Sequence, residues 1–238
     1  MKDERLIVAL DFHKFDDVKN LVKELGDSVN FYKVGMELFY GVGPGIIEWL
    51  QAREKKIFLD LKLHDIPNTV AGGVCSLMKL GADILNIHAA GGFTMMKTAA
   101  EALREEAARR GVEKPKLIAI TILTSMNESE WYGAEKISDQ VVKFARLAQK
   151  AGLEGVVASP NEAKLIREAC GEKFLIVTPG IRPVGSDIND QSRISTPAAA
   201  IQNGANYLVV GRPIRAADNP KLAAENILKE IENANFGN

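Results

Sequence analysis

The stretch Lys56-Ile57-Phe58-Leu59-Asp60-Leu61-Lys62-Leu63-His64-Asp65 changes abruptly from an apolar run to charged residues. Its first half predicts a short buried strand. In an extended chain successive side chains point to opposite faces, so Asp60 and Lys62 share one face and Leu59 and Leu61 the other. An acid and an amine inside a buried strand are costly to desolvate unless they pair or take part in chemistry. A structural ion pair, with Asp65 capping the next helix, and a reactive charge pair are both open interpretations.

On both sides of this stretch, short apolar strands alternate with amphipathic helices. Strands are expected at 5–11, 29–35, 56–59, 82–88, 116–123, 155–158, 174–177 and 206–210, and a loop at 41–45 precedes the second helix. Six of the first seven expected helices end at a glycine: Gly26, Gly81, Gly111, Gly152, Gly171 and Gly204. Glycine supplies the left-handed conformation that ends a helix before a short turn into the next strand.

Regular alternation of this kind indicates parallel strands joined by crossover helices, and eight such units predict a closed (β/α)8 (TIM) barrel. We expect one barrel domain over residues 1–238. A doubly wound open sheet is the alternative. A Gly-x-Gly-x-x-Gly turn after the first strand would favour it, but the sequence there is Asp11-Phe12-His13-Lys14.

Composition restricts the class of protein. Apolar residues make up 46% and charged residues 26% of the 238 residues, which is ordinary for a globular protein with a sizeable core. A net charge of −1 argues against a nucleic-acid partner, which would favour a strongly basic chain. The two cysteines fit neither a disulfide framework nor a metal-site spacing, and no stretch could form a signal peptide or span a bilayer. We therefore expect a cytoplasmic protein without a membrane partner.

Polar residues gather where the expected strands end, which is where active sites lie in this barrel. The strand ends carry Asp11, Lys33, Asp60, Lys62, His88, Thr124, Ser159, Thr178, Gly211 and Arg212. Lysines and carboxylates that converge on one mouth would hold each other in their charged states. This concentration favours the reactive interpretation of the Asp60–Lys62 pair.

Two further features have simpler explanations. His88 is best interpreted as a hydrogen-bonded core histidine, and His64 as a packing or supporting residue beside the charged strand. A metal site could be built from Asp60, Asp65 and His88. However, the Lys62 ammonium lies between the two carboxylates in the sequence and would compete with a cation, so no metal is expected.

The end of the last strand indicates a phosphate site. Loops after the seventh and eighth strands of such barrels commonly bind phosphate through backbone N–H groups. Gly211 permits close approach of the backbone, and Arg212 can form a forked, charge-assisted contact. The long polar loop 182–196, which includes Gln191, is expected to close over the phosphate as a lid.

Taken together, these motifs closely resemble the orotidine 5′-phosphate decarboxylase family. The resemblance is spread over the whole chain and departs from the family pattern at no functional position. The ten-residue block from Asp60 to Thr69 is its most specific part. The matching stretches are Leu10-Asp11, Phe31-Tyr32-Lys33-Val34-Gly35, Asp60-Leu61-Lys62-Leu63-His64-Asp65-Ile66-Pro67-Asn68-Thr69, Leu123-Thr124-Ser125, Thr178-Pro179-Gly180-Ile181-Arg182, Asp190-Gln191-Ser192-Arg193 and Val210-Gly211-Arg212-Pro213.

The resemblance implies decarboxylation of orotidine 5′-monophosphate to UMP without a cofactor. It implies that Lys62 protonates C6, that Asp60 lies against the substrate carboxylate, and that Lys33 and Asp65 complete the charged network. It also implies a homodimer in which Asp65 reaches the neighbouring subunit's site. The remaining contacts it implies are Asp11 and Lys33 to the ribose, Thr124 and Ser125 to the pyrimidine, Gln191, Gly211 and Arg212 to the phosphate, and Arg182 and the segment from Ile66 to Thr69 along the site wall.

Two rival functions remain. One is a magnesium-dependent decarboxylase or aldolase for sugar phosphates on the same barrel, which shares the Asp-x-Lys-x-x-Asp strand. The continuation from His64 to Thr69 and the Gln191 loop favour the orotidylate enzyme. The other rival is a phosphometabolite-binding protein without catalysis, which the intact charge array disfavours.

Overall fold

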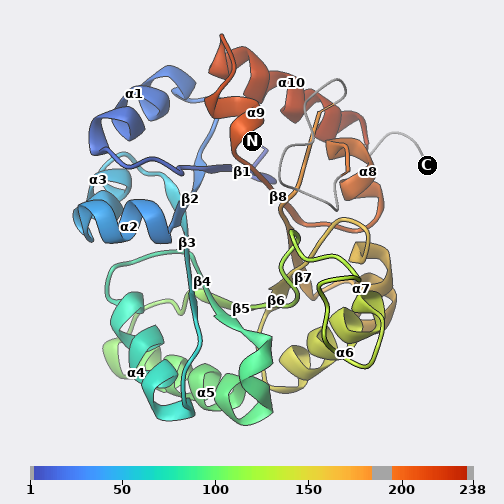
Figure 1. The fold of residues 1–238 in the computed structure, drawn as a ribbon. Helices are drawn as coiled ribbons and strands as arrows, with labels where there is room; N and C mark the ends of the chain where they lie inside the picture. The colour runs from blue at the N-terminus through green and yellow to red at the C-terminus, as the bar shows by residue number, and fades with distance from the viewer. Residues whose placement is uncertain (1–2, 184–194, 235–238) are drawn as a thin grey trace.

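A computed structural model describes residues 3–183 and 195–234, and in it eight parallel strands close into a barrel in the order β1 to β8 (Figure 1). The prediction of a TIM barrel is confirmed. Each strand pairs with its sequence neighbours, and β1 closes the ring against β8. The strands are β1 (Leu6–Ala9), β2 (Phe31–Gly35), β3 (Lys56–Leu63), β4 (Ile84–His88), β5 (Lys116–Ile120), β6 (Gly155–Val157), β7 (Leu175–Thr178) and β8 (Tyr207–Val210).

The helices form a ring outside the strands (Figure 1). They are α1 (Phe15–Leu25), α2 (Met36–Val42), α3 (Gly45–Gln51), α4 (Pro67–Met78), the 3-10 turn η1 (Ala89–Gly91), α5 (Gly92–Arg110), α6 (Ile137–Lys150), α7 (Ala163–Cys170), α8 (Pro197–Gln202), α9 (Arg212–Arg215) and α10 (Pro220–Asn233). Within the described ranges, none of them is both long and apolar enough to cross a membrane.

The six glycines that were expected to end helices all have positive φ, between +52° and +98°. The loop predicted at 41–45 is partly wrong. Gly41 and Val42 belong to α2, which follows β2 directly, and α3 begins at Gly45. Two residues separate the helices: Gly43, the positive-φ C-cap of α2 with φ +76°, and Pro44, the N-cap of α3. The glycine-rich sequence concealed α2 because this short helix buries only Leu38 and shows little apolar periodicity.

Apolar side chains fill both the barrel interior and the layer between strands and helices. The interior cluster has the buried residues Ile7, Ala9, Phe31, Phe58, Ile84, Ile118, Val177 and Val209. The larger cluster includes the opposite faces of the same strands, for example Val8, Leu59 and Leu85, together with the inner faces of the helices. The barrel is therefore a packed core, and a cavity can open only at its ends.

Candidate active site

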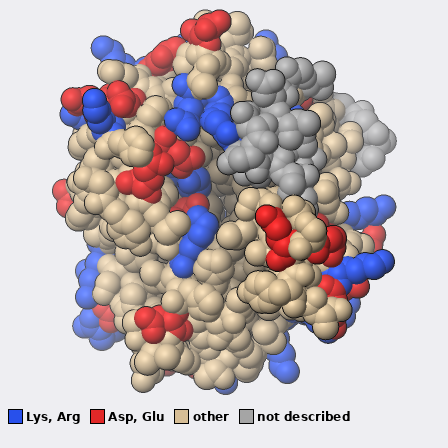
Figure 2. Space-filling view, in the orientation of Figure 1, with Lys and Arg blue, Asp and Glu red and all other residues tan. Residues whose placement is uncertain are grey.

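A cavity of about 570 Å³ opens at the carboxyl ends of the strands. It brings together nine of the residues predicted for the site: Asp11, Lys33, Asp60, Lys62, Thr124, Ser125, Arg182, Gly211 and Arg212. Figure 2 shows positive and negative side chains gathered around the hollow on this face. The floor is apolar, because Phe58, Ile120 and Val209 line it beneath the charged groups.

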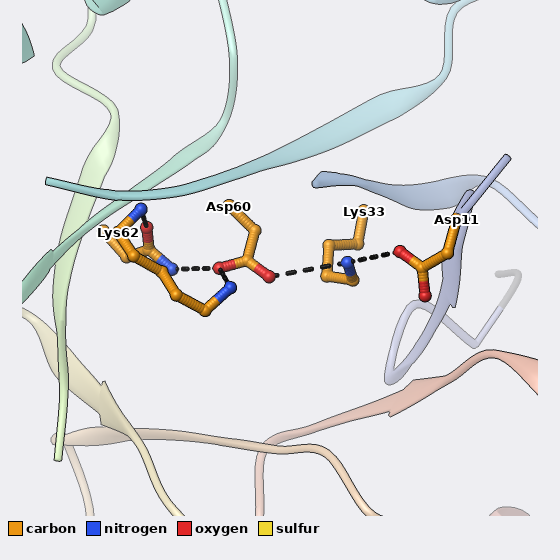
Figure 3. A network of polar contacts seen from close by, with 5 residues as sticks. Asp11, Lys33, Asp60 and Lys62 are labelled. Carbon is orange, nitrogen blue, oxygen red and sulfur yellow. Dashed lines mark hydrogen bonds and ion pairs between the residues drawn. The ribbon is translucent and has the colours of Figure 1, made fainter. Parts of the chain in front are cut away.

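Four charged side chains form a continuous chain across the cavity (Figure 3). Lys33 Nζ lies 2.9 Å from Asp11 Oδ1 and 3.5 Å from Asp60 Oδ2. Lys62 Nζ lies 2.8 Å from the other oxygen of Asp60, Oδ1. The signs therefore alternate from Asp11 to Lys62. Each interior member of the chain, Lys33 and Asp60, has an opposite charge on both sides.

Both interior members are held in their charged forms. Burial raises the pKa of the Asp60 carboxyl, but the ammonium groups of Lys33 and Lys62 and the hydrogen bonds from Lys62 and Asn86 outweigh it, so the pKa lies below its ordinary value. Burial lowers the pKa of Lys33, but the nearby Asp60 and Asp11 carboxylates outweigh it, and the pKa lies above its ordinary value. Neutral pH therefore leaves this buried pair ionised.

Gly35 provides the space that the Lys33 ammonium occupies. It lies two residues after Lys33 on the same face of β2. A Cβ at this position would come within 2.9 Å of Lys33 Nζ and 3.4 Å of Asp11 Oδ1. Any larger residue would force the ammonium away from Asp11, so the glycine protects this ion pair.

Asn86 belongs to the same network, although the sequence analysis did not include it. Its side chain is 1% exposed, and its Nδ2 donates to Asp60 Oδ1 over 2.6 Å. Its Oδ1 accepts the backbone N–H of Lys62 over 2.8 Å. The available signal was a polar residue at the centre of the apolar strand β4, Ile84–His88. Buried polar side chains of this kind are almost always hydrogen-bonded.

Arginine side chains line the wall of the cavity on the side of β7 and β8. Arg182 follows β7, and Arg212 and Arg215 begin and end the short helix α9. Burial, and after it the positive charge of Arg212, lowers the pKa of Arg182. Guanidinium groups gathered on one wall of a cavity favour a bound anion. Arg215 is an addition to the predicted site, and its guanidinium also lies 5.4 Å from the Phe12 ring centroid.

Comparison with known proteins agrees with this geometry. Residues 4–227 match the family described as "Orotidine 5'-phosphate decarboxylase / HUMPS family". The chain belongs to this family. An orotidine 5'-phosphate decarboxylase of Moorella thermoacetica is 49% identical over 96% of this chain and 92% of its own length. That of Carboxydothermus hydrogenoformans is 48% identical over 98% of both chains.

Solved structures of similar proteins have the same fold. The crystal structure of orotidine 5'-phosphate decarboxylase from Lactobacillus acidophilus is 42% identical, covers 96% of this chain and 99% of its own, and gives a TM-score of 0.84. An uncharacterized conserved protein from Geobacillus kaustophilus is 38% identical, covers 95% of this chain and 99% of its own, and gives a TM-score of 0.82. Similarity at this identity extends over the entire barrel.

Four residues that the family resemblance placed in the site do not line the cavity of this single chain. Asp65, Ile66 and Thr69 are exposed, and Ile66 is 67% exposed. Asp65 Oδ1 accepts the backbone N–H of Ile66 over 2.6 Å, and the described residues show no ion pair between Asp65 and Lys62. Gln191, the fourth, lies outside the described residues.

The two histidines near the site pack against each other. The rings of His64 and His88 have centroids 5.3 Å apart and a tilt of 30°. Burial lowers the pKa of His88, and the neighbouring His64 and Lys62 lower it further against the opposing effect of Asp60. In the part of the chain that the structure describes, no three His, Cys, Asp or Glu residues are grouped so that they could hold a metal ion.

Proposed function

We propose that this protein decarboxylates orotidine 5′-monophosphate to UMP and CO2 in pyrimidine nucleotide synthesis, and that it does so without a cofactor. The observation that carries the proposal is the alternating chain Asp11–Lys33–Asp60–Lys62 at the mouth of a barrel, in a sequence 49% identical to an orotidine 5'-phosphate decarboxylase. The matched family is described by two names, and the charge chain and the near relatives support the orotidine 5'-phosphate decarboxylase member.

Loss of CO2 from C6 leaves an electron pair in the plane of the pyrimidine ring, where the π-system cannot delocalise it. A fixed cation beside C6 therefore lowers the barrier. We assign this role to Lys62, whose ammonium also delivers the proton to C6 and forms the C–H bond of UMP. Asp60 orients the ammonium over 2.8 Å and lies against the departing carboxylate. The repulsion between these two carboxylates favours release of CO2.

The other cavity residues are assigned by their places around the mouth. Asp11 and Lys33 bind the ribose hydroxyls, and Thr124 and Ser125 bind the pyrimidine. The phosphate lies against Gly211 and Arg212, with Arg182 along the wall. Gln191 stays a prediction for the same phosphate. Because the phosphate is remote from C6, its binding energy can assemble the site without taking part in the chemistry.

The exposed Asp65 supports a homodimer. The Asp65 carboxylate accepts the backbone N–H of Ile66, and it lies at the surface beside Ile66, which is 67% exposed, so both groups are accessible to a second chain. We propose that a second copy covers this segment and that Asp65 completes the Lys62 site of the partner. Thr69 and Ile66 then line the site from across the interface.

A magnesium-dependent sugar-phosphate decarboxylase or aldolase is the rival within the family, and a non-catalytic phosphometabolite-binding protein is the rival outside it. Both are excluded by one assay. The purified protein is mixed with orotidine 5′-monophosphate and a metal chelator, and the orotate absorbance and UMP are followed. Loss of absorbance with matching UMP formation supports the proposal. Binding without turnover contradicts it, and turnover that the chelator abolishes supports the magnesium-dependent rival.

A further inference from the structure

Asn86 connects the two residues at the reacting end of the charge chain. We propose that Asn86 is a positioning residue for the decarboxylation: it fixes the Lys62 ammonium by holding the Lys62 backbone with one end of its amide and the Asp60 carboxylate with the other. The inference deepens the proposed function and rests on it. It concerns how the Asp60–Lys62 pair is kept in place, since Asn86 itself does not line the cavity.

The first argument is the distortion of β3 at Lys62. The β3–β4 ladder pairs Leu59 with Leu85 and next pairs Leu63 with Ile87, so residues 60–62 of β3 face only Asn86 of β4. Lys62 has a φ of +53°, which the described residues show at only one other non-glycine residue, Glu54. A left-handed conformation is strained in a non-glycine residue, and its surroundings must hold it in place.

The second argument is that the Asn86 amide supplies the missing ladder contact. The Lys62 N–H has no strand partner in the bulge, and Asn86 Oδ1 accepts it over 2.8 Å. Because a backbone N–H can only donate and the Asp60 carboxylate can only accept, this pair of contacts fixes the amide orientation. To make both contacts, the side chain must be as long as that of asparagine and carry one acceptor and one donor. Asparagine alone among the uncharged residues provides them.

The third argument is the arrangement at Asp60. Oδ1 of Asp60 receives both Asn86 Nδ2, over 2.6 Å, and Lys62 Nζ, over 2.8 Å. The Asn86 amide therefore fixes the plane of the Asp60 carboxylate. The carboxylate in turn fixes the Lys62 ammonium (Figure 3). Because Asn86 is 1% exposed, bulk solvent does not compete for these hydrogen bonds. Since a displacement of 1 Å at a reacting group can lower a rate on the order of 100-fold, this contact has direct consequences for turnover.

The experiment compares Asn86→Leu, Asn86→Asp and a matched control, Asn206→Leu, in the full chain. Asn206 is also an asparagine whose Oδ1 accepts a backbone N–H of the adjacent strand, that of Ile176 over 2.8 Å, but it precedes β8 at the opposite end of the barrel. We expect Asn86→Leu to lower kcat on the order of 100-fold while UMP affinity changes little. We expect Asn206→Leu to lower the thermal midpoint and leave kcat unchanged.

Asn86→Asp provides a test that a purely structural role would not pass. Its protonated carboxyl repeats the amide's pattern, because the carbonyl oxygen accepts from Lys62 N–H and the O–H donates to Asp60. Its ionised form repels Asp60. We therefore expect the ratio of variant to wild-type kcat to rise as the pH falls through the pKa of the introduced acid, while the ratio for Asn86→Leu stays flat.

A wild-type kcat in Asn86→Leu, or a pH-independent ratio in Asn86→Asp, would overturn the inference. If Asn86→Leu fails to fold, the Asn86→Asp profile decides. Absence of turnover in the wild-type protein would contradict the proposed function instead. In that case the inference is tested by carbon NMR, which follows the titration of the Asp60 carboxyl in Asn86→Asp and in the wild-type protein. A titration unchanged from the wild-type protein would overturn it.

Discussion

The Lys62 ammonium lies 2.8 Å from Oδ1 of Asp60, although the backbone takes a left-handed turn at Lys62. In a regular strand the two side chains would also lie on one face, but the extended backbone would set the distance between them. The bulge between Leu59 and Leu63 instead lets the Lys62 side chain fold back onto the Asp60 carboxylate of the same strand. The pair is thus assembled from one strand. Its geometry depends on the local backbone of β3 and on the Asn86 side chain of β4, which contacts both residues.

Replacement of Lys62 by alanine removes the group proposed to supply both the proton and the cation beside C6. We expect Lys62→Ala to abolish turnover and to leave the fold intact, because Lys62 lies at the cavity and its side chain is 24% exposed. Steady-state assays with orotidine 5′-monophosphate measure turnover, and far-ultraviolet circular dichroism checks that the fold is intact. The matched control is Lys56→Ala at the other end of β3, where the ammonium pairs with Glu4 at the surface. Near-normal turnover in Lys62→Ala would contradict the proposed role of Lys62.

The fold and most of the site could be predicted from the sequence because both depend on local regularities. Strand and helix periods, and a glycine such as Gly26 at the end of a helix, repeat with every unit of the barrel. The strand ends must meet at one mouth once the barrel is closed. The sequence alone therefore predicts that Asp11, Lys33, Asp60 and Lys62 lie together at the mouth, although they come from three different strand ends.

The parts that could not be predicted depend on single contacts. The left-handed Lys62 follows from a register shift between β3 and β4, which no periodicity reveals. Asn86 is an isolated polar residue in an apolar strand, and Arg215 lies one turn beyond the expected phosphate loop. The role proposed for Asp65 requires a second subunit. Its place relative to Lys62 is therefore not determined by one chain.

Truncation of Arg212 tests the phosphate end of the cavity. We expect Arg212→Ala to weaken UMP binding by about 1.5–3 kcal/mol, the contribution of a hydrogen bond to a charged group. Uridine has no phosphate, so its affinity should not change. Titration calorimetry with both ligands measures the difference. The control is Arg104→Ala, an exposed arginine of α5 outside the cavity, which should bind UMP as the wild type does. Equal losses for UMP and uridine would contradict the phosphate assignment.

Acid should selectively weaken the contribution of Asp60 to stability. Its folded-state pKa lies below the ordinary value of 3.8, so its ionisation stabilises the fold above pH 3.8 and this contribution is lost as the pH falls through the folded value. We expect Asp60→Asn to lower the free energy of unfolding by about 3–5 kcal/mol at pH 7, because Lys33 and Lys62 lose their shared carboxylate. The difference from wild type should hold down to about pH 4 and shrink below it.

Urea unfolding of both proteins at a series of pH values measures this difference. A surface carboxylate provides the control. Asp16 pairs with Lys19 one turn away in α1 and is largely exposed, so Asp16→Asn should change stability by less than about 1 kcal/mol at every pH. A difference between Asp60→Asn and wild type that grows in acid would mean that the carboxylate is not stabilised by its neighbours.

Mixing two inactive variants tests whether Asp65 serves the partner subunit. If each site uses Lys62 of one chain and Asp65 of the other, a heterodimer of Lys62→Ala and Asp65→Ala subunits has one complete site and one site that lacks both residues. Random reassociation in equal amounts should then restore about one quarter of the wild-type activity per chain, since half of the dimers are mixed and each has one intact site. Activity after denaturation and joint refolding is compared with that of the variants refolded separately. If Lys62 and Asp65 act within one chain, every site in the mixture lacks one of them and joint refolding restores nothing. That result would refute the shared site.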